Sequence, residues 1–289
     1  MADLPAEIRA LYPFKSHWLD IPAGRLHYVD EGQGKAVIML HGNPTWSFFY
    51  RDLIKDLRGT HRCIAPDHIG CGLSDKPQDW TYRLQDHIDN VVALVNSLGL
   101  ESFSLVVHDW GGAIGMGLAE ALPSKVKRFV ILNTAAFRSQ RIPLRIAACK
   151  VPVFGEWIVR GLNAFAGPAA KMSVSTPLPP PVKAGFLFPY DSWANRIATH
   201  RFVADIPLKP EHPSYAALLR VEEGLAQFQE RPMLIVWGQR DFCFNDHFLA
   251  EWRKRFPQAA TKLFPNAGHY VLEDAGTEAR TAITQFLND

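Results

Sequence analysis

The sequence predicts an α/β fold in which a mostly parallel central sheet carries an inserted helical cap. Three observations support this prediction. Short, nearly unbroken apolar runs recur along the 289-residue chain, as expected for strands that are buried on both faces of a sheet. Helical patterns separate these runs, and this alternation is typical of a parallel sheet. One long stretch, residues 134–228, has helical patterns but no clear buried strand.

The first elements are predicted to form an antiparallel hairpin, because alternating apolar residues at 18–20 and 26–29 flank a Pro-Ala-Gly turn. Apolar residues at helical spacing predict a helix over residues 84–98 that stops at Gly99, a natural C-terminal cap. The strands of the parallel sheet are expected at residues 37–40, 63–65, 103–107, 129–132, 234–237 and 261–264.

Residues 134–228 are interpreted as a helical cap inserted after the strand at 129–132, so that residues 1–133 and 229–289 form the core domain. The cap segment contains a stiff proline-rich connector at residues 177–181. Its large apolar residues suggest a pocket between cap and sheet, although at least half of them must form the cap's own core. These residues are Phe154, Trp157, Leu162, Phe165, Phe186, Leu187, Phe188 and Trp193.

Composition and charge exclude several classes of protein. A hydrophobic content of 47% is ample for a globular core, and a net charge of +2 gives no basic stripe for nucleic acid. The chain does not start like a signal peptide and has no apolar stretch of membrane-spanning length, so secretion and membrane insertion are not expected. The cysteines are scattered without metal-ligand spacing and are interpreted as reduced thiols. We therefore expect a cytoplasmic protein without a metal or cofactor. The cysteines are Cys63, Cys71, Cys149 and Cys243.

Residues 106–112 end an apolar strand on a turn that holds the side chain of Asp109 in the open. Gly111 and Gly112 are the small residues that let strand and helix pack closely in a nucleophile elbow. A carboxylate at this position indicates attack on a saturated carbon, because it is ionised at neutral pH and forms an ester that water can cleave. The alternative is that Asp109 only caps the following helix.

Two further residues complete a catalytic triad with Asp109. Asp241 follows the strand at 234–237 and His269 follows the strand at 261–264, in the chain order nucleophile, acid, histidine. His269 is expected to take a proton from the water that attacks the ester, and Asp241 to hold the imidazole in the required tautomer. Either residue alone has a simpler structural explanation, but their order after strands favours catalysis.

The loop after the strand at 37–40 is expected to donate a backbone N–H to an oxyanion hole, together with the backbone N–H of Trp110. The side chains of Asn43 and Trp110 offer an amide and an indole N–H that can hold a leaving anion such as a halide. The alternatives are a turn or helix-cap role for Asn43 before Pro44, and a core role for Trp110.

Across essentially its whole length, the chain resembles the α/β-hydrolase superfamily and, within it, the haloalkane dehalogenases. The position of Asp241 and the lack of a carboxylate in residues 133–137 resemble the third dehalogenase subfamily. That branch contains the β-lactone decarboxylases of bacterial long-chain olefin synthesis, which residues 132–137 and 189–196 especially resemble. The family motifs are matched by His41-Gly42-Asn43-Pro44, by residues 67–74, and by His108-Asp109-Trp110-Gly111-Gly112.

The resemblance implies an α/β-hydrolase fold and two reactions that begin with the same Asp109 ester. We put hydrolysis of a haloalkane to an alcohol first, and decarboxylation of a cis-β-lactone to a cis-alkene and CO₂ as the alternative. Epoxide hydrolysis ranks lower. Epoxide hydrolases use two cap tyrosines to open the epoxide, and the candidates here, Tyr190 and Tyr215, lie in no supporting motif. A non-catalytic binding protein ranks lowest, because all five polar positions are present. The expected partner is a small apolar substrate; a homo-oligomer or a complex with other pathway enzymes is left open.

Overall fold

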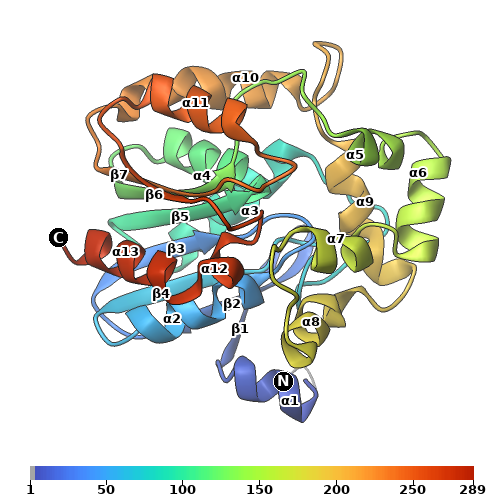
Figure 1. Cartoon of the computed structure of the whole chain (residues 1–289), viewed down its shortest axis with the longest axis horizontal. Helices are drawn as coiled ribbons and strands as arrows, with labels where there is room; N and C mark the ends of the chain where they lie inside the picture. Colours follow the sequence, from blue (N-terminus) through green and yellow to red (C-terminus); the bar gives the residue numbers. More distant parts are fainter. Residues whose placement is uncertain (1–3) are drawn as a thin grey trace.

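The computed structural model describes residues 4–289, so residues 1–3 of the predicted core domain lie outside the described part of the chain. Its centre is an eight-stranded sheet with the order β1-β2-β4-β3-β5-β6-β7-β8 (Figure 1). Strand β2 pairs antiparallel with β1 and β4, and all other pairs are parallel. The predicted hairpin and mostly parallel sheet are therefore confirmed. The strands are β1 (Ser16–Ile21), β2 (Gly24–Glu31), β3 (Lys35–Leu40), β4 (His61–Pro66), β5 (Phe103–Asp109), β6 (Val126–Thr134), β7 (Met233–Gly238) and β8 (Ala260–Phe264).

Helices cover both faces of the sheet, because side chains along each strand alternate between two apolar clusters. On β3, Ile38 and Leu40 belong to the cluster beneath α3, α4, α10 and α11, whereas Val37 and Met39 belong to the cluster beneath α2, α12 and α13. The central strands β3 to β7 are thus mostly buried on both faces, as their apolar runs predict, whereas the edge strands β1 and β8 are partly exposed. The helices that cover it are α2 (Arg51–Leu57), α3 (Leu84–Ser97), α4 (Trp110–Ala121), α10 (Tyr215–Gly224), α11 (Asp246–Arg255), α12 (Val271–Asp274) and α13 (Gly276–Asn288).

Helix α3 confirms the predicted helix over residues 84–98. Its buried positions recur at helical spacing and include Ile88, Val91 and Leu94. Gly99 follows the helix with φ +60°, a left-handed conformation that glycine adopts without a steric cost.

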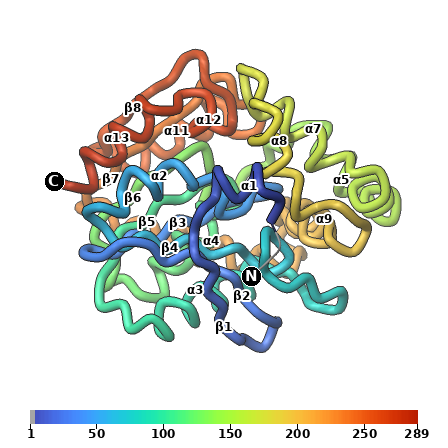
Figure 2. The backbone as a smooth tube through the Cα atoms, turned by 90° about the horizontal axis from the view of Figure 1, so that it is seen from below, coloured from blue at the N-terminus to red at the C-terminus, as the bar shows by residue number. Residues whose placement is uncertain are grey.

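A group of short helices lies beyond the carboxyl ends of the parallel strands, on the side of the molecule opposite the C-terminus (Figures 1 and 2). This group is the inserted cap. Helix α10 is part of the predicted cap range, residues 134–228, but packs on α3 and α4 of the core. The division of the chain at 133/134 and 228/229 remains a prediction. The cap helices are α5 (Leu144–Cys149), α6 (Phe154–Glu156), η2 (Trp157–Gly161), α7 (Ala166–Met172), α8 (Pro180–Leu187), η3 (Phe188–Tyr190), η4 (Ala194–Arg196) and α9 (Ile197–Ala204).

Three short helices complete the fold. Helix α1 packs against α8 of the cap, and η1 precedes α2 directly. In residues 4–289, no helix combines the length and the apolar character needed to cross a membrane. The three helices are α1 (Ala6–Leu11), η1 (Ser47–Tyr50) and η5 (Leu225–Phe228).

Candidate active site

Asp109 lies at the sharp junction between β5 and α4, with φ +51° and ψ −124°. The turn is so tight that only glycine fits after it. A Cβ atom on Gly111 would overlap the carbonyl of Leu40, and one on Gly112 would overlap the Thr134 hydroxyl. The Asp109 carboxylate makes no capping hydrogen bond to α4, although the residue occupies the N-cap position. This geometry supports a nucleophile elbow rather than a helix cap.

Asp241 and His269 lie next to each other in the loops after β7 and β8. The His269 Nδ1–H donates to Asp241 Oδ2 at 2.7 Å, because an ionised carboxylate can only accept. This tautomer leaves His269 Nε2 directed at Asp109, 3.8 Å from Oδ2. The backbone N–H of Cys243 donates to Asp241 Oδ1 at 2.7 Å. Both oxygens of the buried acid therefore have partners, and the ring has one orientation.

The two oxygens of Asp109 have different surroundings. Oδ1 accepts the backbone N–H of Asn43 at 2.6 Å, an approach that Gly42 allows because a Cβ there would overlap the carboxylate. Oδ2 faces His269 and is free to attack a substrate. The Asn43 N–H thus lies where an oxyanion hole is needed, on the oxygen that becomes the carbonyl of an Asp109 ester.

Burial and charge act in opposite directions on the two titratable groups. Burial raises the pKa of Asp109, although His269 and the backbone N–H groups of Asn43 and Trp110 oppose the increase. Burial opposes protonation of His269, but the carboxylates of Asp241 and Asp109 outweigh it and raise the pKa of His269. Asp109, Asp241 and His269 are consequently coupled through charge.

The side chains predicted to hold a leaving anion both lie at the cavity. Asn43 Nδ2 donates to the Thr199 carbonyl at 3.1 Å, which fixes the amide orientation and leaves a second hydrogen on the same nitrogen. Trp110 lines the cavity and contacts Phe202, with ring centroids 5.2 Å apart. A role for these two donors in binding an anion remains a prediction.

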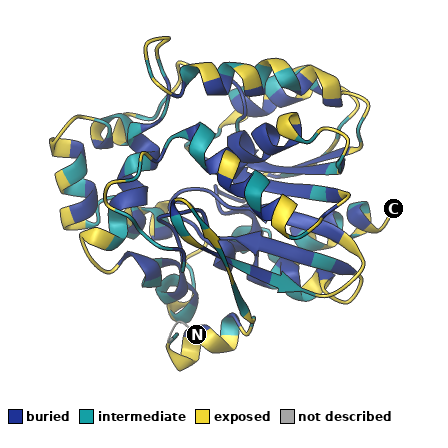
Figure 3. Ribbon diagram, turned by 180° about the vertical axis from the view of Figure 1, so that it is seen from behind, coloured by how far each residue is buried: buried dark blue, intermediate teal, exposed yellow. Residues whose placement is uncertain are grey.

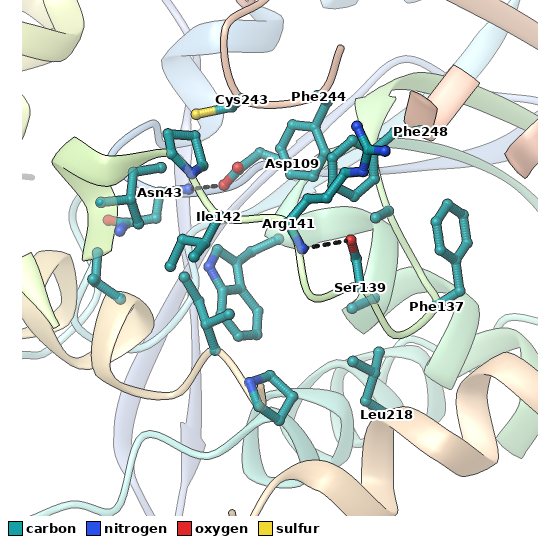
Figure 4. Close-up of a pocket in the computed structure, with 18 of the residues that line it drawn as sticks. Asn43, Asp109, Phe137, Ser139, Arg141, Ile142, Leu218, Cys243, Phe244 and Phe248 are labelled. Carbon is teal, nitrogen blue, oxygen red and sulfur yellow. Dashed lines mark hydrogen bonds between the residues drawn. The ribbon is translucent and has the colours of Figure 1, made fainter. Parts of the chain in front are cut away.

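The cavity has two arms that meet at Asp109 and Asn43. The first arm, about 150 Å³, runs between the sheet and the loop after β6, and Figure 4 shows Phe137, Phe244 and Phe248 along it. The second arm, about 320 Å³, runs beneath α5 and α7. Besides the shared residues, the first arm is lined mainly by Leu84, Ala113, Ala135, Val203, Ile206 and Leu218, and the second by Cys149, Ala164, Pro168, Ala169, Met172 and Phe242.

An apolar cavity lies between cap and sheet, as predicted, but few of the eight large apolar cap residues line it. Among the eight, Phe165 contributes to both arms, and Phe186 packs in the core against Phe48 and Tyr270. Four others are exposed at the surface instead, because the short cap helices do not bury all of their faces. They are Phe154, Trp157, Leu162 and Trp193.

Asn133 is a positioning residue that the sequence argument missed. Its Nδ2 donates to Asp241 Oδ2 at 3.0 Å and to the Gly238 carbonyl at 2.9 Å, and its Oδ1 accepts the Gly238 N–H. It therefore joins the end of β6 to the loop that carries the acid. A polar residue directly after the apolar run at 129–132 was the available signal.

The remaining histidines near the site have structural partners. His108 Nε2 hydrogen-bonds to the His269 carbonyl at 3.0 Å, and His41 Nε2 accepts the backbone N–H of His68 at 3.0 Å. Across residues 4–289, no group of three or more His, Cys, Asp or Glu side chains is arranged to hold a metal ion.

Known proteins are similar to this chain in sequence and in fold. Residues 35–276 match the model of the alpha/beta hydrolase fold family. A cis-3-alkyl-4-alkyloxetan-2-one decarboxylase of Shewanella oneidensis is 47% identical, over 96% of this chain and 90% of its own length. Haloalkane dehalogenase 2 of Mycobacterium bovis is 33% identical, over 95% of this chain and 96% of its own length. The crystal structure of haloalkane dehalogenase DbeA from Bradyrhizobium elkani superposes with a TM-score of 0.87 at 26% identity, over 95% of this chain and 98% of that chain.

A match over most of the chain, with identities above 30% across full-length relatives, establishes the family. The fold and family expected from the sequence are therefore confirmed: the chain belongs to the α/β-hydrolase superfamily as an enzyme similar to both β-lactone decarboxylases and haloalkane dehalogenases.

Proposed function

We propose that this enzyme decarboxylates cis-3,4-dialkyloxetan-2-ones, which are β-lactones, to cis-alkenes and CO₂. The observation that carries the proposal is the two-armed apolar cavity, whose arms meet at Asp109. A β-lactone with alkyl groups on adjacent ring carbons needs two apolar channels that diverge from one reacting carbon, whereas a simple haloalkane needs one. The identity to the Shewanella decarboxylase supports the same choice. The sequence-based order, which put haloalkane hydrolysis first, is reversed.

The first step is displacement at the ring carbon that bears the ring oxygen. Asp109 Oδ2 attacks this sp³ carbon, the carbon–oxygen bond of the ring breaks, and the electron pair leaves with the carboxylate of the former lactone. The configuration at the attacked carbon inverts. The N–H groups of Asn43 and Trp110 are available to this new carboxylate, as they are to a halide.

The second step returns Asp109 to its starting state. The bond between the substrate carboxylate and its carbon breaks, the electron pair forms the alkene, and the carbon–oxygen bond to Asp109 breaks. CO₂ and the Asp109 carboxylate are released, so water and protons are neither consumed nor produced. The backbone N–H of Asn43 stabilises the departing carboxylate through Oδ1. Inversion followed by anti elimination converts a cis-lactone to a cis-alkene.

Hydrolytic dehalogenation is the second candidate, favoured by the His269–Asp241 pair. The Nε2 atom of His269 faces Asp109, as is required of a base that activates water to cleave an Asp109 ester. Epoxide hydrolysis has no such support. Tyr190 donates to the Thr45 carbonyl at 3.2 Å and the Tyr215 hydroxyl accepts from Arg138 at 3.1 Å, and neither residue lines the cavity arms.

A side-by-side assay of a dialkyl cis-β-lactone and a 1-bromoalkane tests the proposal. Alkene is measured by gas chromatography with mass detection, and bromide by ion chromatography. We expect a far higher kcat/KM for alkene formation, cis geometry in the product and no β-hydroxy acid. Faster bromide release, or lactone hydrolysis to a β-hydroxy acid, would overturn the proposal. The Asp109→Ala variant controls for uncatalysed loss of CO₂.

A further inference from the structure

The cap exposes a cluster of large apolar side chains. Seven of the ten large apolar residues that are exposed within residues 4–289 fall between positions 144 and 172. Leu144 is 88% exposed and Val153 82%. Scattered surface residues of this kind need no explanation, but a contiguous cluster marks a binding surface. We define the cap face as Leu144, Val151, Val153, Phe154, Trp157 and Leu162, which lie on or beside α5, α6 and η2; Figure 3 colours exposed residues of the cap yellow.

The segment that bears the cap face is strongly basic. Residues 138–172 hold six cations and one anion, whereas the whole chain has a net charge of only +2. Arg138 pairs with Glu222, and Arg160 with Glu156. In the described part of the chain, the other four cations form no ion pair within 4.0 Å. They are Arg141, Arg145, Lys150 and Lys171.

The cap face adjoins the entrance of the cavity. Arg141 lines the first arm and Arg145 the second, and both residues are exposed, so the cavity reaches the surface at the start of α5. Leu144 lies between them in the sequence. Met172, at the end of α7, lines the second arm and is 36% exposed. Apolar and basic side chains therefore surround the entrance.

We propose that the cap face docks on an anionic lipid surface and opens the cavity toward the acyl region of the bilayer. Apolar and aromatic side chains bury into the boundary between headgroups and acyl chains, while nearby cations bind the acidic headgroups. Anionic lipid is a better match than a protein partner, because this segment combines exposed apolar side chains with exposed cations that form no ion pair within residues 4–289, and it holds a single acidic residue. The docking is peripheral. It does not depend on which reaction occurs at Asp109, since any apolar substrate that fits this cavity partitions from water into lipid.

Vesicle flotation measures the docking without any turnover. We expect the full-length protein to float with vesicles of phosphatidylcholine containing phosphatidylglycerol, to remain behind with pure phosphatidylcholine, and to dissociate as salt is raised. A Leu144→Ser, Val153→Ser double variant is expected to lose most of the binding. Lys171→Glu should weaken binding by at least roughly fivefold, the effect of one cation near such a surface. Lys127→Glu, at the start of β6 far from the cap, is the charge-matched control and should bind normally.

Trp157 reports on the depth of docking. Lipids with a spin label on the acyl chain should quench part of the protein's tryptophan fluorescence, and Trp157→Phe should remove that part. Unchanged turnover of a short, water-soluble substrate by each variant verifies that it is folded. Equal flotation of the variants and the wild type, or no flotation at low salt, would overturn the proposal. So would sedimentation that reveals self-association through Leu144 and Val153, or binding to a protein through them in place of lipid.

Discussion

The catalytic edge of the sheet and the cap differ in how their side chains are held. At the edge, Asp109 ends β5 and Asp241 and His269 lie in the loops after β7 and β8, and hydrogen bonds from the backbone or from neighbouring side chains fix these buried residues. The cap consists of short helices, with six residues in α5 and three in α6. Its own apolar cluster in the described chain contains three buried residues, Cys149, Val159 and Val203.

This difference separates chemistry from substrate choice. The sheet edge holds Asp109, Asp241 and His269 in fixed positions, with Asp241 hydrogen-bonded to His269 at 2.7 Å and His269 Nε2 3.8 Å from Asp109, as chemistry at one carbon requires. The cap supplies walls, and helices this short are stable only through packing, so their side chains can change without disturbing the sheet. We expect substitutions at the edge to affect the reaction itself, and substitutions in the cap to affect which molecules reach it.

The largest contrast between the two regions is expected at Asp109. Asp109→Ala removes the oxygen that forms the ester, so alkene and bromide formation should both fall by on the order of 10⁵-fold or more. Leu144→Ser, on the exposed side of the cap, should stay within about twofold for a water-soluble substrate. Steady-state kinetics and mass spectrometry of the trapped ester provide the measurements. A substantial residual rate in Asp109→Ala would exclude the covalent route.

His269→Gln is expected to separate the two candidate reactions within the edge itself. Hydrolysis of the ester needs a base, so release of the alcohol should slow by roughly 10²- to 10⁴-fold and bromide should appear as a single burst. Decarboxylation transfers no proton, so alkene should continue to form over many turnovers. Stopped-flow bromide detection and alkene yield per enzyme are the readouts. An alkene burst of one equivalent would mean that His269 also acts in the second step.

The difference between the regions also explains what the sequence predicted. The positions of the strands along the chain, the turn at Asp109 and the loops that carry Asp241 and His269 follow from apolar runs and local turn residues, which a sequence displays directly. The apolar pocket was expected, but the cap residues that line it could not be assigned, because burial in the cap depends on which short helices meet. Phe165 faces the cavity while Phe154 faces solvent, although both lie in similar apolar surroundings in the sequence.

Asn133 was missed for a different reason. Its contact with Asp241 joins residues that are 108 positions apart, across neighbouring strands β6 and β7. Sequence patterns report the periodicity of one element, whereas strand order determines which ends of elements meet. The strand order was expected only as a mostly parallel sheet, so no partner for Asn133 could be assigned.

The two reactions should depend differently on pH, because hydrolysis of the ester needs a base and decarboxylation does not. A raised pKa keeps His269 protonated to higher pH, so kcat for bromide release should fall as the pH drops through the pKa of His269. Esterification removes the charge of Asp109 but leaves that of Asp241. Alkene formation needs only an ionised Asp109 and should persist to lower pH, down to the raised pKa of that carboxyl. Superimposable profiles would show that both reactions depend on one group.

The smallest effects are expected in the cavity arms, and they test whether two arms are used. Ala135→Leu fills the first arm and Ala169→Leu the second, and both alanines are partly exposed in the cavity walls. Each substrate methylene displaced from its arm should cost about 0.8 kcal/mol of transition-state binding free energy, which lowers kcat/KM roughly fourfold. The measurement uses β-lactones whose two alkyl chains are shortened independently. Each variant should be rescued by shortening a different chain, because each arm holds one. Rescue of both variants by the same chain would mean that a single arm binds the substrate, which favours a haloalkane.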